Sequence, residues 1–120
     1  MLSLIAGLVL GAAGASAVWA LRADSTPADA SPAADARAAC QALDGFDPDK
    51  YTAKGSAGEI ALNRYAAAGA FSASAAAGDA QYKPLADAIR RSQDRHARVF
   101  DFDATAKKDL DRARSFCDGL

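Results

Sequence analysis

The feature that most restricts the fold of this chain is its single pair of cysteines. Cys40 and Cys117 are the only two cysteines in the 120 residues, and they lie near the two ends of the region that has the composition of a folded domain. If they are joined, their Cα atoms must lie within about 7 Å of each other. Whether they are joined depends on the compartment, because disulfides persist in oxidising compartments and are rare in reducing ones.

The segment after the first methionine indicates the compartment. Residues 2–21 are uncharged and mostly apolar, and a helix of that length spans about 30 Å, the thickness of a bilayer core. Trp19 and Arg22 follow at one end, where an aromatic ring and a cation suit the membrane–water interface. We therefore predict that residues 2–22 form a transmembrane anchor or, alternatively, a signal segment.

Two features of this segment leave alternatives open. Ala15-Ser16-Ala17 has the small-x-small form of a cleavage site, so a cleaved signal and a secreted helical protein are the alternative to an anchor. Gly7, Gly11 and Ala15 are spaced by four, and such a stripe allows two membrane helices to approach closely. A homodimer through this face is one expectation, although small residues are common throughout the chain.

The expected location is the cell membrane, with one span and the C-terminal domain outside, or the secreted fraction if the segment is cleaved. In either place Cys40 and Cys117 are predicted to form one disulfide. Two buried thiols would be the better expectation only for a cytosolic domain.

The rest of the chain divides into a linker and one small domain. Residues 23–32 are small, polar and proline-bearing, as expected of a linker. Residues 33–120 carry helix signals and no strand alternation. Helices are predicted from a Ser31-Pro32 cap to about 43, from a Ser56–Glu59 capping box over about 57–77, from Asp79 to about 99, and from an Asp103 cap to Gly119.

These signals predict an all-α fold, a small antiparallel helical bundle of about four helices with one disulfide. Because both cysteines lie near the C-terminal ends of their helices, a strict up-down bundle would hold them at opposite poles. The first helix is therefore expected to cross the fourth obliquely or to run parallel to it. The large side chains expected in the core are Leu43, Ile60, Leu62, Phe71, Leu85, Ile89, Leu110 and Phe116.

Residues that could carry chemistry are few. Arg90, Arg91, Arg95 and Arg98 could bind an anion, but nearby aspartates at i,i+4 spacing favour a salt-bridged solvent-facing surface. His96 lies on an apolar stripe without a partner ligand, which favours a core or boundary position over a metal or catalytic one.

No nucleophile, phosphate-loop or metal motif stands out in the sequence. A loop counted from Asp47 departs from the EF-hand pattern, because Thr52 and Gly58 stand where glycine and glutamate are required. We therefore expect no catalytic, metal or cofactor site, and the chain is not expected to be an enzyme. A formal net charge of −1 argues against nucleic acid as a partner.

The layout of an apolar start, a linker, "ACQALDGFD", "YKPLADAIRRSQ" and a final cysteine resembles uncharacterised small exported or membrane-anchored helical proteins of high-GC bacteria. That resemblance implies export and a helical domain, and no activity. The expected role is a membrane-tethered, extracytoplasmic interaction or envelope-associated module that contacts the membrane through the helix of residues 2–22 and binds a protein partner. A carrier of a small apolar ligand in the bundle core is the alternative.

Overall fold

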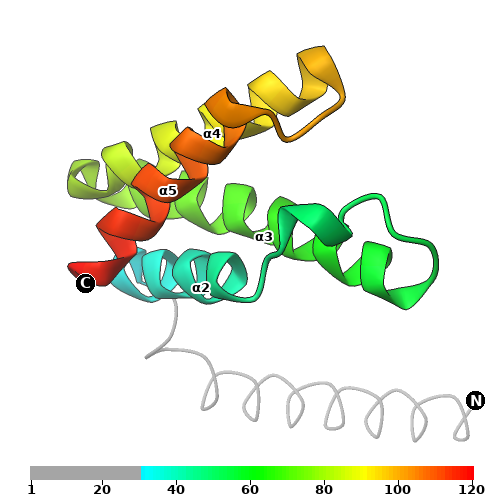
Figure 1. Ribbon diagram of the computed structural model, residues 1–120. Helices are drawn as coiled ribbons and strands as arrows, with labels where there is room; N and C mark the ends of the chain where they lie inside the picture. Colours follow the sequence, from blue (N-terminus) through cyan, green and yellow to red (C-terminus); the bar gives the residue numbers. More distant parts are fainter. Residues whose placement is uncertain (1–30) are drawn as a thin grey trace, which may run out of the picture. The chain divides into compact units, whose positions relative to one another are not determined.

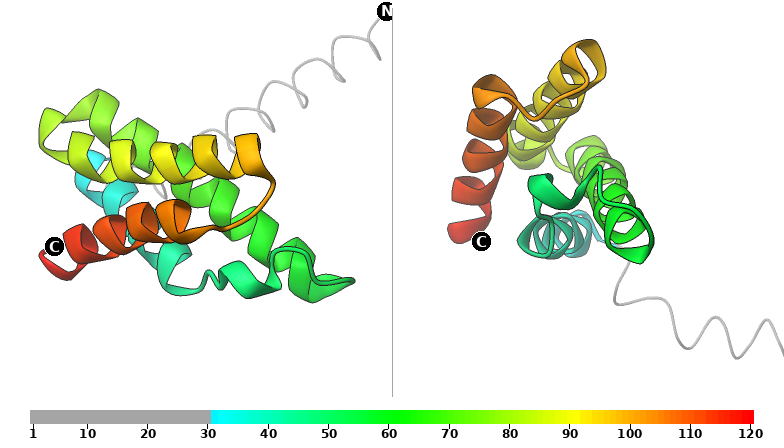
Figure 2. Two further views of the ribbon diagram at one scale, coloured as in Figure 1. Left: turned by 45° about the horizontal axis from the view of Figure 1, so that its top comes forward. Right: turned by 45° about the vertical axis from the view of Figure 1, so that its right-hand side comes forward.

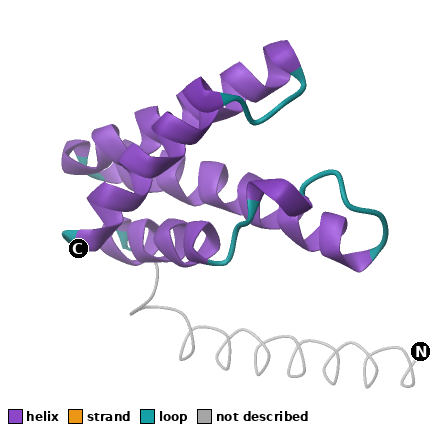
Figure 3. Ribbon diagram, in the orientation of Figure 1, coloured by secondary structure: helices purple, strands orange, loops and turns teal. Residues whose placement is uncertain are grey.

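Four α-helices joined by short connections make up residues 31–120, the part of the chain that the structure describes. In this computed structural model two single 3-10 turns precede the second and third of these helices (Figure 3). The elements are α2 (Pro32–Asp44), η1 (Pro48–Lys50), α3 (Ser56–Gly78), η2 (Ala80–Tyr82), α4 (Lys83–Val99) and α5 (Ala104–Asp118). No strand occurs within residues 31–120. The predicted all-α fold with four helices is confirmed.

Side-chain caps begin two of the four α-helices of residues 31–120. The Oγ atom of Ser31 accepts a hydrogen bond from the amide of Ala34 at 3.1 Å, and Pro32 occupies the first turn of α2. The carboxylate of Asp103 accepts from the amide of Ala106 at 3.0 Å and begins α5. These two predicted caps are confirmed.

The predicted capping box of Ser56 and Glu59 is wrong. Gly55 is the N-cap of α3 with φ of 75°, and no side chain caps that end. The left-handed conformation is available to Gly55 because glycine has no Cβ. The helix therefore begins one residue earlier than predicted, and Ser56 is its first residue rather than its cap.

Successive helices reverse direction, and each packs against the next (Figure 1). The chain forms two helical pairs, α2 with α3 and α4 with α5, and the α3–α4 contact joins the pairs. The helix α5 slants across α2 in Figure 1, and in the right-hand view of Figure 2 it runs from top to bottom while α2 is seen nearly end-on. The expected oblique crossing of the first and last helices is confirmed.

The core of the bundle contains few large side chains. Leu43, Leu85, Ile89 and Leu110 are fully buried, as predicted, and Phe116 is partly buried. Most of the other buried side chains are alanines, one or more from each helix. Small side chains allow helix axes to approach closely, so burial here comes from close packing more than from side-chain volume.

The prediction failed on α3, whose large apolar side chains face solvent. Ile60, Leu62 and Phe71 are 50%, 48% and 41% exposed. The buried face of α3, the inner seam, instead consists of Gly58, Ala61, Tyr65, Ala68, Ser72 and Ala75. Because α3 packs against both α2 and α4, its contact face is occupied by residues that let two neighbours approach.

Candidate functional site

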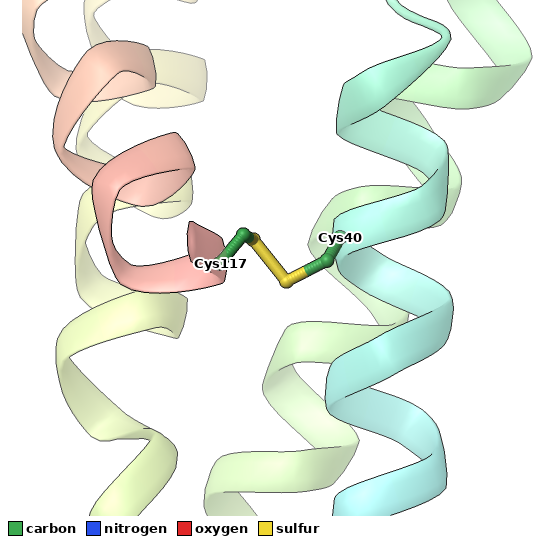
Figure 4. Close-up of a disulfide and its surroundings, with 2 residues drawn as sticks. All are labelled: Cys40 and Cys117. Carbon is green, nitrogen blue, oxygen red and sulfur yellow. A yellow bond between two sulfur atoms is a disulfide. The ribbon is translucent and has the colours of Figure 1, made fainter. Parts of the chain in front are cut away.

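The disulfide joins the two helical pairs. Cys40 of α2 and Cys117 of α5 are bonded, with their Cα atoms 5.6 Å apart (Figure 4). This confirms the predicted pairing. Both cysteines are partly exposed and line a surface groove of about 370 Å³, together with Leu43, Asp44, Arg114 and Asp118. The bond is therefore a covalent link close to solvent rather than part of the sealed core.

An aromatic cluster lies where five separate segments meet. Phe46 and Tyr65 stack with ring centroids 4.8 Å apart, and His96 lies 4.3 Å from Phe102 and 4.7 Å from Tyr51. The five rings come from the α2–η1 loop, the end of η1, α3, α4 and the α4–α5 loop. The cluster holds the loops against the helices, and such ring pairs contribute roughly 0.5–1.5 kcal/mol each beyond their burial.

Tyr65 is the polar centre of this cluster. Its hydroxyl lies 2.8 Å from the Oγ atom of Ser92, and both side chains are buried. Burial raises the pKa of Tyr65 to about 12, which outweighs the lowering effect of the Ser92 hydrogen bond. The phenol is therefore neutral at physiological pH and suits a structural hydrogen bond rather than proton transfer.

His96 occupies the boundary position that its place on the apolar stripe indicated. It is half-buried and packs on Tyr51 and Phe102. Within residues 31–120 no group of three or more histidine, cysteine or acidic side chains is placed to hold a metal ion. Asp47, at the start of the loop compared with an EF-hand, instead caps η1 by accepting from the amide of Asp49 at 3.0 Å.

A shallow apolar groove runs beside the cluster, between α3 and α4. Its volume is about 360 Å³. The α3 side contributes Leu62, Tyr65 and Ala66, the α4 side contributes Gln93, His96 and Ala97, and Tyr51 completes it. Gln93 is held in place because its Nε2 donates to the carbonyl of Tyr65 at 3.0 Å. The groove is an open surface depression with aromatic walls and one fixed amide.

The arginine row on α4 is only partly paired, and not as predicted. The pairs expected at i,i+4 spacing are Asp87–Arg91, Arg90–Asp94 and Asp94–Arg98, and among the described residues none of them forms an ion pair. Arg90 instead pairs with Asp87 at i,i+3 spacing, at 3.3 Å. Arg95 reaches across the α4–α5 corner and binds Asp103 at 2.6 Å. That hydrogen bond lowers the pKa of Asp103, as does the α5 cap.

The charges around the groove that these arginines border do not favour anion binding. It is lined by Arg91, Asp94, Arg95, Arg98, Thr105 and Asp109. Two carboxylates offset two of the three guanidinium groups, and a third carboxylate, Asp103, holds Arg95. The row is therefore a mixed-charge surface, as the spacing of acids and bases in the sequence indicated.

Sequence patterns did not reveal the aromatic cluster. Phe46, Tyr51 and Phe102 lie in connections or at a turn end, where no helical period applies. Phe100 was also missed: it ends α4 in the left-handed conformation with φ of 56°, and it is 84% exposed. The available signal was three aromatic residues in short connections of a chain with few aromatic residues.

Several predicted features lie outside the described residues. These are the membrane-interface residues Trp19 and Arg22 and the small-residue stripe of Gly7, Gly11 and Ala15. Within residues 31–120, none of the helices has the length and hydropathy needed to cross a membrane.

Comparison with known proteins assigns no relative. No family model, no curated protein and no solved structure matches the chain. The resemblance to small exported proteins of high-GC bacteria therefore stays a prediction, and a function has to be argued from the residues themselves.

Proposed function

We propose that this protein is a membrane-tethered, extracytoplasmic helical module that binds other protein surfaces and carries no catalytic activity. The tether is residues 2–22, and the module is residues 31–120, because Ser31 and Pro32 begin α2 rather than end the linker. Residues 23–30 join the two. The proposal combines an apolar segment of membrane-spanning length with a small cross-linked domain.

The observation that carries the proposal is the bond between Cys40 and Cys117. A disulfide between partly exposed cysteines is kept in an oxidising compartment, and reducing compartments remove it. A domain of this size with an alanine-dominated core depends strongly on a cross-link for its stability. That stabilisation persists only where no cellular reductant breaks the bond. These two arguments support a position outside the cytoplasm.

The exposed apolar side chains of α3 support a binding role. Ile60, Leu62 and Phe71 face solvent along one helix, although the same helix buries alanines. Ile60 and Leu62 line different surface grooves, so α3 exposes apolar side chains on two sides, and exposed apolar surface of this kind is typical of protein contact sites.

Membrane fractionation of the full chain tests the tether. We expect the protein in the membrane pellet after a carbonate wash, and we expect Leu8→Asp with Val9→Asp to release it, because charges in a span are costly. The matched control, Leu8→Ala with Val9→Ala, should stay in the pellet. A chain recovered in the medium and beginning near Val18 would support the secreted alternative instead.

A labelling experiment tests on which side of the membrane the module lies. A membrane-impermeant maleimide applied to intact cells should label Ser56→Cys, which lies at an exposed site, and should not label the native chain. Labelling of Ser56→Cys only after the cells are opened would place the module in the cytoplasm and contradict the proposal.

A second candidate, a carrier of a small apolar ligand, is favoured by the groove between α3 and α4. The groove has about 360 Å³ of space and aromatic walls, which falls at the small end of ligand sites. It lies on the surface beside His96, whereas the core expected to hold the ligand is filled by Leu85, Ile89 and Leu110. Native mass spectrometry distinguishes the two: a co-purifying small molecule supports the carrier, and a bare chain mass supports the binding module.

A further inference from the structure

The two ends of α5 are held against the rest of the domain in different ways. At its start, the buried Phe102 packs on Tyr65, with ring centroids 5.2 Å apart. Asp103, in the same connection, pairs with Arg95 of α4 at 2.6 Å. At its end, the disulfide reaches from the last turn of α5 to α2 (Figure 4). Noncovalent contacts therefore fix the start of α5, and a covalent bond fixes its end.

The noncovalent contacts of the last turns of α5 are sparse. No residue after Ala113 is buried. Phe116 packs on Tyr82 with ring centroids 6.3 Å apart, and Arg114 donates to the carbonyl of Phe46 at 2.9 Å. Phe116 and Arg114 are both partly exposed, and the contact of α5 with α2 is small beside its contact with α4. A helix end with so little buried surface opens more readily than a core helix.

The rest of the bundle is packed independently of the disulfide. The helix α2 packs on α3, and α5 packs on α4 through the fully buried Leu110. The hydrogen bond between Tyr65 and Ser92 joins α3 to α4 inside the core. These contacts lie away from the last turn of α5, so they stay in place when that turn is free.

The disulfide is also open to a reagent from solvent. Cys40 and Cys117 are both partly exposed and line the surface groove of about 370 Å³. Thiol–disulfide exchange requires that a thiolate reach one of the two sulfur atoms. A groove beside a partly exposed bond provides that approach while the domain stays folded.

We propose that the Cys40–Cys117 bond is a redox latch: a dithiol reduces it in the folded protein and frees residues 114–120 from α2, while the rest of the bundle stays folded. A thiolate of the dithiol attacks one sulfur, forms a mixed disulfide and releases the other cysteine, which takes up a proton. The second thiol of the dithiol then releases the remaining cysteine, which is also protonated, and closes the reductant's own disulfide. Two electrons and two protons pass to the chain.

The latch is reversible, because a chain with two cysteines has one internal pairing to restore on oxidation. It is closed in oxidising surroundings and opens when a reductant reaches the protein. Opening uncovers the side of Tyr82 that Phe116 covers in the closed form. The latch goes beyond the proposed binding role and does not depend on the membrane tether.

Reduction under native conditions tests whether the bond is reached without unfolding. The oxidised full chain in detergent is treated with dithiothreitol, and the thiols that appear are counted by mass after reaction with N-ethylmaleimide. We expect a rate that is proportional to the dithiothreitol concentration and nearly unchanged by urea below the unfolding transition. A bond reached only through global unfolding is reduced at a rate that rises steeply with urea, and that result would overturn the proposal.

Hydrogen exchange of the same samples tests what the reduction frees. After reduction, the amides of residues 114–118 should approach the exchange rate of an unfolded peptide. Those of α3, α4 and residues 108–112 should stay at least about a hundredfold slower than that rate. Cys40→Ser with Cys117→Ser is the matched control and should show the reduced pattern with and without dithiothreitol.

Two outcomes of this exchange experiment contradict the latch. Loss of protection throughout α3 and α4 would mean that the reduced domain unfolds as a whole. Unchanged exchange at residues 114–118, in the reduced chain or in the double serine variant, would mean that other contacts hold the end of α5.

Discussion

At the scale of single residues, the most informative contact is the hydrogen bond between Tyr65 and Ser92. It lies inside the bundle and joins α3 to α4, and among the described residues no fully buried side-chain polar atom lacks a partner. A buried hydrogen bond gives a modest net gain, but removal of one partner leaves the other without a partner at a larger cost. The pair therefore fixes how α3 and α4 meet.

A double-mutant cycle on this pair should show coupling. Ser92→Ala leaves the buried Tyr65 hydroxyl unpaired and should lower the free energy of unfolding by about 1–3 kcal/mol. In Tyr65→Phe the Ser92 hydroxyl can turn to a carbonyl of its own helix, so a cost of about 1 kcal/mol is expected. The double variant should cost less than the sum, by about 1 kcal/mol, in urea melts. Strict additivity would mean that the 2.8 Å contact contributes nothing.

The pH dependence of stability provides an independent check. The pKa of Tyr65 in the folded protein is raised to about 12, whereas the phenol of an unfolded chain ionises near its ordinary value of about 10. The stabilisation that comes from keeping the Tyr65 phenol protonated is therefore complete below about pH 10, and it is lost as the pH rises through the folded-state pKa. Tyr65→Phe should flatten the fall in stability over this window, and an unchanged slope would contradict the raised pKa.

At the scale of elements, α3 depends on glycine where its first turn meets the preceding loop. A Cβ atom added at Gly58 would lie 1.9 Å from the carbonyl oxygen of Ala53, a backbone atom that cannot move aside alone. At Gly69 the nearest atoms are the end of the Gln93 side chain, which can rotate away. Two glycines of one helix therefore have opposite expected responses.

Thermal melts should separate these two positions. Gly58→Ala should destabilise the domain by about 1–3 kcal/mol, because the loop must shift. Gly69→Ala removes the Gln93 contact but gains up to about 1 kcal/mol of helix propensity, so its melting temperature should change little or rise. If both variants lose stability equally, the clash at Ala53 is not what makes Gly58 necessary.

At the scale of the whole molecule, the disulfide determines how firmly the two helical pairs stay together. The α2–α5 contact is small beside the α2–α3 and α4–α5 contacts, and it is the one that Cys40 and Cys117 reinforce. One further link between the pairs is Arg114 of α5, which donates to the carbonyl of Phe46 at 2.9 Å. Without the disulfide, the ends of α2 and α5 are held mainly by the packing of α2 on α3 and of α5 on α4.

Removing the bond should destabilise the domain strongly. We expect reduction, or Cys40→Ser with Cys117→Ser, to lower the free energy of unfolding by roughly 2–4 kcal/mol, because the unfolded chain then gains conformational freedom. For a domain of this length, the melting temperature should fall by about 10 °C or more. Thiol titration before and after denaturation checks the bond, and melts with and without reductant check its effect. A melt unaffected by reductant would show that the α3–α4 contact suffices.

Local sequence was enough to predict the four helices and the starts of α2 and α5, because caps, prolines and glycines act within a few residues of where they stand. Ser31 and Asp103 cap the helices that follow them. Asp79, predicted to cap the third helix, instead caps the single turn η2, and α4 begins at Lys83 without a side-chain cap. The cysteine pairing was equally accessible, since the chain has only two cysteines and one pairing is possible.

Packing in three dimensions was needed to select the buried face of α3. Alanines occur around most of that helix, so its sequence has no strongly one-sided period and does not by itself select a buried face. Close approach of α2 and α4 selected the inner seam and left Ile60 and Phe71 outside. The aromatic cluster was out of reach of local patterns for a related reason, because its rings lie in segments that meet only after the helices pack.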